Sequence, residues 1–152
     1  MAYAAATTEL DRGVRNGDQS SLKMDAVKIV KGSLVCGDAT AGYVTSAAPT
    51  ASRPFVGVAL ETVYNSAGSA GDKSILVGHV GVFPLKNTVD THNQALLLKE
   101  MYWDDSADSD SQTVASSDQG VGAKVGRVIA QDATHVWVRI TGYAMVVDGQ
   151  AN

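Results

Sequence analysis

A glycine-rich stretch in the middle of the chain contains residue types that bind phosphate in other proteins. Residues 68–74 read Gly-Ser-Ala-Gly-Asp-Lys-Ser, with a lysine and a serine after two glycines. A phosphate-binding loop needs glycine directly before Lys-Ser or Lys-Thr, because successive backbone amides then surround the phosphate, and a helix must follow. Here Asp72 places a negative charge at that position, and a strand pattern follows. The stretch therefore predicts a turn without a bound nucleotide.

The acidic residues 104–111 are the next candidate, because carboxylates are ligands for calcium. An EF-hand loop needs alternating oxygen ligands, glycine at its sixth position and glutamate at its twelfth. Counted from Asp108, the sixth residue is Thr113, and the later glutamate is missing. We interpret the segment as a solvated loop and predict no metal site, with a weak, irregular cation site as the alternative.

The other reactive residue types form no catalytic pattern. His79, His92 and His135 are far apart, and the chain has no Gly-x-Ser-x-Gly turn of a serine hydrolase. Cys36 is the only cysteine, which excludes an intramolecular disulfide and a cysteine-based zinc site. We expect it to be a buried, small apolar residue. The sequence thus predicts no catalytic residue, no cofactor and no metal, and a protein that is not an enzyme.

Short strands are the elements that the composition predicts around these residues. Charged residues make up only 18% of the chain and glycines number 15, which favours strands joined by tight turns. We expect a mainly β fold, with strands near residues 27–30, 33–36, 43–45, 55–63, 74–83, 101–103, 112–115, 123–130 and 134–140.

Three of these expectations concern individual elements. Residues 55–63 have apolar side chains on both faces, which indicates a central or closed-sheet strand. Pro84 lacks an amide donor, so it should close the preceding strand or sit on an edge. The one helix predicted is short and spans residues 90–99, with Asp90 or Thr91 as its cap.

The hairpin formed by residues 123–130 and 134–140 has the clearest pattern. In its second strand, Val136, Val138 and Ile140 share one face, and His135, Trp137 and Arg139 share the other. The first set predicts a core face. For Trp137 beside Arg139, covering a barrel end is favoured over binding a ligand.

The two ends of the chain differ from the middle. Residues 1–23 are polar and show neither a strand nor a helix period, which indicates a frayed terminus or an arm that orders against a partner. We divide the chain into this N-terminal arm, a β-rich domain at residues 24–147 and a polar tail at residues 148–152.

Charge and hydropathy limit the function further. The net charge is −4 and the 12 lysines and arginines are scattered, which disfavours a nucleic-acid partner. No apolar run reaches membrane-spanning length, and the N-terminus lacks a signal pattern. We therefore expect no membrane association and synthesis in the cytoplasm, with retention or assembly there.

Several short sequence segments occur in a recognisable order along residues 24–141. They are 27–35, 41–44, 55–61, 65–74, 81–83, 101–105, 126–129 and 136–140. Together they resemble a family of phage and prophage structural proteins, the capsid decoration or head cement proteins. Relatives are sometimes labelled recombinases, a label that the charge and the broken phosphate-loop phrase oppose here. Two segments depart from the family pattern. Residues 95–98 are more apolar than usual, and the apolar residues 142–147 near the C-terminus are interpreted as an added strand or a subunit contact.

The resemblance implies a compact β-barrel or β-sandwich-like domain with one short helix and an extended N-terminal arm. It also implies a place on the outer surface of the virion head, made in the host bacterial cytoplasm, with the major capsid protein as partner and self-association as a homotrimer. In this view the arm contacts the capsid through Leu10, Arg12, Val14, Arg15 and Leu22.

Two rival functions stay open. One is a tail, baseplate or glycan-binding β-module of the virion, in which Tyr102, Trp103 and Trp137 offer stacking platforms for sugars. The other, with less support, is a small enzyme on a β-barrel.

Overall fold

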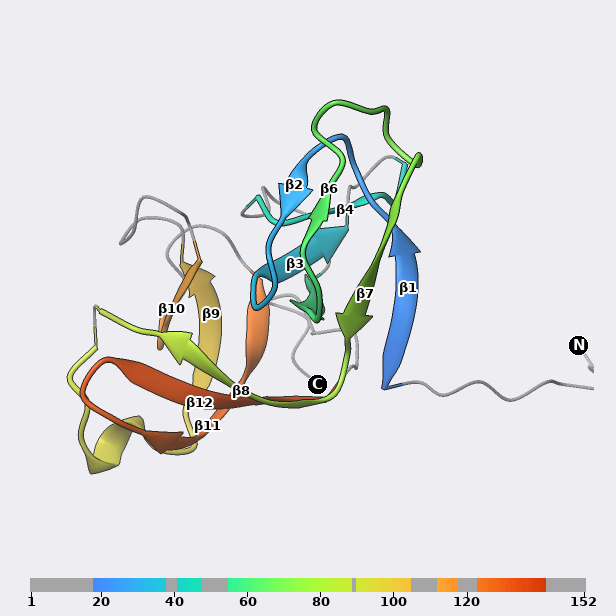
Figure 1. Cartoon of the computed structure of the whole chain (residues 1–152). Coiled ribbons are helices and arrows are strands. Elements are labelled where there is room, and N and C mark those ends of the chain that lie inside the picture. Colours follow the sequence, from blue (N-terminus) through green and yellow to red (C-terminus); the bar gives the residue numbers. More distant parts are fainter. Residues whose placement is uncertain are drawn as a thin grey trace, which may run out of the picture.

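The computed structural model describes residues 18–37, 41–47, 55–88, 90–104, 112–117 and 123–141. As expected, the chain is mainly β, and it contains a closed five-stranded barrel and a further five-stranded sheet (Figure 1). The strands are β1 (Gln19–Lys23), β2 (Lys28–Ile29), β3 (Leu34–Gly37), β4 (Val44–Thr45), β5 (Phe55–Ala59), β6 (Val63–Tyr64), β7 (Ser74–Gly78), β8 (Gly81–Lys86), β9 (Glu100–Asp104), β10 (Thr113–Ala115), β11 (Lys124–Gln131) and β12 (His135–Ile140).

The first half of the chain forms the open sheet, in the order β1-β7-β5-β3-β4. Its two edges come together where Met24 forms a parallel bridge with Val44, and Asp25 N donates to Val44 O at 2.9 Å. The sheet therefore curls around its own core instead of lying flat. The short pair β2-β6 forms a separate ribbon beside it.

The second half forms the barrel, in the order β10-β8-β12-β11-β9, with β10 and β9 closing it. The hairpin of β11 and β12 confirms the sequence pattern, because Val136, Val138 and Ile140 are buried and Trp137 and Arg139 are exposed. The alternation is set locally by the pleat of the strand, which explains why it could be predicted.

Two buried clusters hold these halves together. One fills the barrel and includes Leu34, Cys36 and Val58, and the other fills the curled sheet and includes Val35 and Ala59. Neighbouring residues of β3 and β5 therefore point into different cores. This explains the apolar side chains on both faces of β5, which is central in its sheet as predicted. Cys36 is fully buried, also as predicted.

The long strand expected at residues 55–63 is interrupted. β5 ends at Ala59, and the two polar side chains that follow accept hydrogen bonds from backbone amides in place of backbone carbonyls. Glu61 Oε1 accepts from Leu76 N at 2.9 Å, and Thr62 Oγ1 accepts from Lys31 N at 2.9 Å. The chain then resumes as β6. Such long-range contacts of side chains with the backbone leave no trace in local periodicity.

The strand expected at residues 74–83 is also two strands, β7 and β8, in different sheets. Glycines stand on both sides of the break, and Gly81 has a φ of +151° that other residues rarely adopt. Pro84 lies inside β8 and does not close it, contrary to one of the two expectations. In an antiparallel pair of strands, hydrogen-bonded and non-hydrogen-bonded residue pairs alternate. Asn87 N donates to Thr134 O at 3.0 Å, so Asn87 belongs to a hydrogen-bonded pair between β8 and β12. Pro84, opposite Trp137, then belongs to a non-hydrogen-bonded pair, where β12 needs no amide donor from it.

The short helix predicted at residues 90–99 is shorter than expected and has a different cap. The structure has only a single 3₁₀ turn, η1 (Gln94–Leu96), whose cap is Asn93 and not Asp90 or Thr91. The chain leaves the turn because Leu98 N donates to Val128 O at 2.8 Å, and Val128 N to Lys99 O at 3.0 Å. Pairing with β11 thus overrides the helix propensity of the leucine run.

The boundary of the N-terminal arm is also corrected. Residues 19–23 form β1, which pairs antiparallel with β7 along its whole length. Leu22 packs against the core of the curled sheet, so it is not an arm residue. The other proposed arm residues, Leu10, Arg12, Val14 and Arg15, lie outside the described residues, as does the tail at 148–152.

Asp90 fastens the connection after β8 to the end of β10. Its carboxylate accepts hydrogen bonds from Ser116 N at 2.7 Å, Ser116 Oγ at 2.5 Å and Asn87 Nδ2 at 2.8 Å. Burial raises the pKa of Asp90, but these hydrogen bonds and the charge of Lys99 outweigh it, so that the pKa lies below its ordinary value of 3.8. The ionised carboxylate therefore stabilises the fold.

We expect Asp90→Asn to lower the free energy of unfolding at pH 7 by about 1–3 kcal/mol, because the amide offers one acceptor atom where three donors converge. A depressed pKa gives stability that is complete above the unfolded value near 3.8 and is lost as the pH falls through the folded value. Urea unfolding from pH 7 to pH 2 should show the two proteins converging in acid. A constant difference at all pH values would contradict this.

Gln112 joins the barrel to the curled sheet. Its Oε1 accepts from Leu34 N at 2.6 Å and its Nε2 donates to Ser46 O at 2.7 Å. We expect Gln112→Ala to destabilise the protein by about 1–3 kcal/mol, because the buried Leu34 amide loses this acceptor. Gln112→Glu keeps an acceptor for that amide and should cost less. Urea unfolding of both variants checks this, and equal losses would contradict it.

Candidate functional site

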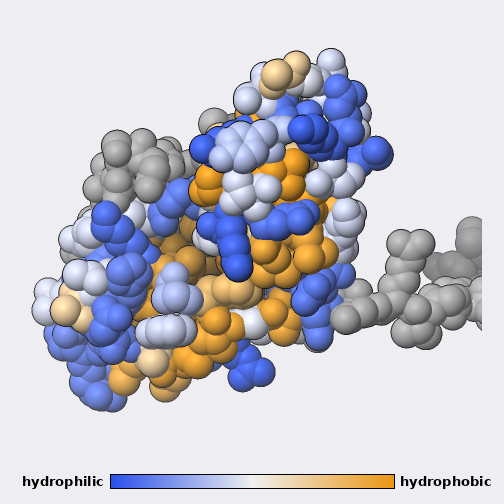
Figure 2. Space-filling view, in the orientation of Figure 1, coloured by the Kyte–Doolittle hydropathy of each residue, from blue (hydrophilic) through white to orange (hydrophobic). Residues whose placement is uncertain are grey.

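Exposed apolar side chains gather on and beside the barrel. Among the described residues, five of the seven large exposed hydrophobic residues are found there, namely Val80, Val82, Leu98, Ile129 and Trp137. Hydrophobic residues are visible at the surface over the region of β8, β11 and β12 (Figure 2). A concentration of this kind on one side of a small protein marks a candidate contact surface.

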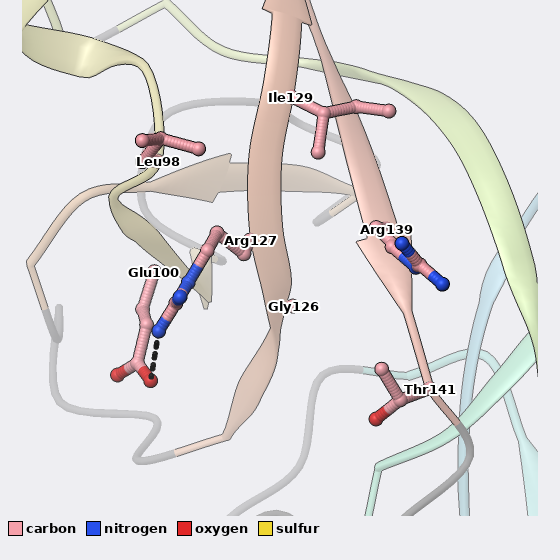
Figure 3. Close-up of a pocket in the computed structure, with 7 residues that line it drawn as sticks. All are labelled: Leu98, Glu100, Gly126, Arg127, Ile129, Arg139 and Thr141. Carbon is pink, nitrogen blue, oxygen red and sulfur yellow. Dashed lines mark ion pairs between the residues drawn. The ribbon is translucent and has the colours of Figure 1, made fainter.

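Two arginines lie on the same surface. Arg127 of β11 and Arg139 of β12 are directly opposite each other in the strand register, and Arg139 is in turn opposite Val82 of β8. Their side chains nevertheless diverge, since that of Arg127 extends toward Glu100 and that of Arg139 extends to the other side of β11 (Figure 3). Of these two arginines, the sequence pattern assigned only Arg139 to this face. The position of Arg127 depends on the pairing register of β11 with β12, which the sequence does not state.

A groove runs over β11 between these side chains. It has a volume of about 480 Å³ and is lined by Leu98, Glu100, Gly126, Arg127, Ile129, Arg139 and Thr141. In Figure 3, Leu98, Glu100 and Arg127 lie on one side of it, and Arg139 and Thr141 lie on the other. We call this site the outer barrel groove.

The groove has a surplus of positive charge. Glu100 is shared between Lys124 at 3.2 Å and Arg127 at 3.9 Å, so one carboxylate faces two cations. Within the described residues, the Arg139 side chain makes no hydrogen bond or ion pair. The groove is therefore suited to a ligand that is apolar along part of its length and carries a negative charge.

Three irregularities of the backbone shape the groove. The pairing of β11 with β12 skips Ile129, which makes Ile129 a bulge residue with its side chain exposed. Leu98 has a φ of +68° and is 69% exposed, an unusual conformation for leucine. A Cβ on Gly126 would lie 2.2 Å from Arg139 O, so only glycine allows this approach of β11 to β12. Such features often cluster at functional sites.

The lining offers binding groups and no recognisable machinery for covalent chemistry. Its polar groups are two guanidinium groups, one carboxylate and one hydroxyl. Within the described residues, His, Cys, Asp and Glu side chains form no group of three or more that is placed to hold a metal ion. In that part of the chain no helix has both the length and the apolar character needed to cross a membrane.

No family model, curated protein or solved structure matches this chain.

The glycine-rich stretch at 68–74 is a turn before a strand, as the sequence predicted. Asp72 Oδ2 accepts from Ser69 N at 2.8 Å, and Lys73 Nζ donates to Tyr64 O at 2.6 Å. Both charged side chains are thus engaged within the loop. Of the acidic segment, Asp104 is buried in β9, and residues 105–111 lie outside the described part of the chain.

The three histidines do not meet, but one of them meets a serine. His79 Nε2 lies 2.5 Å from Ser20 Oγ, and its Nδ1 lies 2.9 Å from Val56 O. Because the carbonyl of Val56 can only accept, Nδ1 carries a proton and donates to it, and Nε2 is the ring nitrogen that meets the serine hydroxyl. Ser20 lies within β1, opposite Val77, and not at the exposed turn of a serine nucleophile. We interpret the pair as a tie between β1 and the bend after β7.

Both ends of the described chain come to this same bend. Gln19 pairs with Gly78 at the end of β7, and Ile140 pairs with Gly81 at the start of β8. His79 N also donates to Asp18 O at 2.8 Å. Asp18 and Ile140, at the two ends of the described chain, are therefore held close to this bend, next to the exposed Val80 and Val82.

Proposed function

We propose that this protein is a structural decoration protein of a tailed-phage head, which binds the outer capsid surface and stabilises the lattice of the major capsid protein. The ordered set of sequence phrases over residues 24–141 carries the proposal. A small, cross-tied β domain with an exposed apolar and basic surface supports it, because a cement protein needs rigid contact surfaces and no catalytic group. Binding only to the assembled shell stabilises it by mass action.

In this proposal residues 1–17 are the capsid-binding arm. Asp18, the residue that follows them, is held at the bend before Val80 and Val82, so in this proposal the arm and that apolar surface meet the capsid on one side. Leu10 and Val14 are its apolar anchors, and Arg12 and Arg15 pair with acidic capsid groups. Ordering on the shell adds contact area that the free arm lacks. Self-association as a homotrimer belongs to the same proposal.

Sedimentation of the full chain with expanded heads of the phage or prophage that encodes it tests the function. We expect saturable binding to heads and none to dissociated capsid subunits. Deleting residues 2–17 leaves β1 and its core contacts in place, and should weaken binding at least about tenfold, equivalent to about 1.4 kcal/mol. A full-length chain with Leu10, Arg12, Val14 and Arg15 replaced by serine is the matched control. Unchanged occupancy by both variants would overturn the role of the arm.

The glycan-binding alternative loses one of its platforms in the structure. Trp103 is fully buried, and Tyr102 is half-buried with Lys124 Nζ at 5.8 Å from its ring centroid. Trp137 alone of the three is exposed, at 39%. Binding to cell-surface glycans with no binding to heads would favour this alternative.

A further inference from the structure

The outer barrel groove has features that call for an occupant. Leu98 and Ile129 expose apolar surface, Arg127 shares the single carboxylate of Glu100 with Lys124, and the Arg139 side chain has no ion pair within the described residues. An occupant would be favourable on both counts, because burial removes apolar surface from water and a carboxylate gives an unpaired guanidinium a charged hydrogen-bond partner. A segment with apolar residues and a carboxylate would satisfy both at once.

The chain itself leads such a segment to the groove. Thr141 is the last residue described before the C-terminal segment, and it lines the groove. Residues 142–148 read Gly-Tyr-Ala-Met-Val-Val-Asp, which is a glycine, five apolar residues and one carboxylate. Glycine tolerates the backbone angles of a sharp reversal, so Gly142 is a suitable turning point.

The length of the segment also fits. Six residues from Tyr143 to Asp148 span about 20 Å when extended. The floor of the groove, from Gly126 to Ile129, is about 10 Å long at the usual rise of a strand. After a turn at Gly142, the segment is long enough to cross Leu98 and Ile129 and to bring Asp148 within reach of an arginine.

We propose that residues 143–148 of the same copy dock in the outer barrel groove, with the apolar side chains on Leu98 and Ile129 and the Asp148 carboxylate paired with Arg127 and Arg139. The segment thereby covers the exposed apolar surface of the groove and supplies a second carboxylate to its surplus of positive charge. This inference does not rest on the proposed capsid function, and its test needs no capsid.

Hydrogen exchange of the full chain, followed by mass spectrometry of the peptide that contains residues 143–148, tests the docking. We expect exchange about tenfold slower than in the free peptide, because docked amides exchange through local opening. Arg127→Glu combined with Arg139→Glu should remove this protection. Lys31→Glu, an exposed charge reversal in the turn before β3, is the control and should leave it unchanged.

A charge exchange makes the test specific. Asp148→Arg should abolish protection, and combining it with Arg139→Asp should restore a large part of it. Exchange of residues 143–148 at the rate of the free peptide would overturn the proposal, and so would protection that survives the double arginine reversal. Protection that rises with protein concentration would also overturn it, because the segment would then occupy the groove of a second copy.

Discussion

Trp103→Ala is expected to lower the free energy of unfolding by about 3–5 kcal/mol, the largest effect of any single substitution that we predict. Trp103 is the largest fully buried side chain, and it lies in the core of the barrel. Its ring meets that of Phe55 edge to face at a centroid distance of 6.3 Å, so it also ties β9 to β5 of the curled sheet. Alanine would leave a cavity at the junction of the two halves.

Urea unfolding followed by far-ultraviolet circular dichroism measures this effect, since tryptophan fluorescence changes with the substitution itself. Domains of this size have a total stability of about 5–15 kcal/mol, so the variant should be marginally folded. Trp103→Phe is the matched control, because it keeps an aromatic ring against Phe55 and should lose much less. A loss below about 1 kcal/mol for Trp103→Ala would contradict the packing described, since opening such a cavity in a core costs far more.

Gly126→Ala should destabilise the protein by about 3 kcal/mol, at the upper end of overpacking effects. The new Cβ would lie 2.2 Å from Arg139 O and 2.9 Å from Val138 Cγ1. A carbonyl held in the β11-β12 ladder cannot move aside as a flexible side chain does. The hairpin would have to separate, and the floor of the outer barrel groove would change with it.

Gly32→Ala is the control for this prediction. Gly32 has a φ of +88° but nothing within 4 Å of the added Cβ, so its substitution tests backbone strain alone. We expect a loss of about 1 kcal/mol there. Thermal and urea unfolding of both variants give the comparison. Equal losses would mean that the close approach of β11 to β12 contributes nothing beyond ordinary glycine effects.

The predicted elements succeeded where local patterns decide the structure. The alternation of Val136, Val138 and Ile140 with Trp137 and Arg139 needs only the pleat of one strand, and the structure agrees with it. The strand predicted near residues 101–103 is also present, as β9. The mainly β class follows from composition, because glycine and β-branched residues disfavour long helices.

The failures share a different cause, since each depends on a distant partner. Residues 19–23 are polar and are a strand because β7 lies beside them. The run of three leucines at 96–98 has helix propensity, but backbone hydrogen bonds with Val128 hold its end against β11. The break after Ala59 depends on Glu61 reaching Leu76 N. None of these partners is close in sequence.

The outer barrel groove was only half visible in the sequence. The pattern placed Arg139 and Trp137 on the outer face, but the contribution of Arg127, Ile129 and Leu98 depends on the register of β11 and on its bulge. An added residue in one strand shifts all later neighbours, and no sequence period reports it. The one available signal was an arginine followed by two apolar residues at 127–129, of which Ile129 is exposed and Val128 is buried.

The most direct test of the capsid function is electron cryomicroscopy of expanded heads, from the phage or prophage that encodes this chain, after incubation with the purified protein. The account predicts added density on the outer surface at symmetry-equivalent positions, into which the described β domain fits with its Val80 and Val82 side toward the shell. Heads that stay bare at a saturating concentration of folded protein would contradict it.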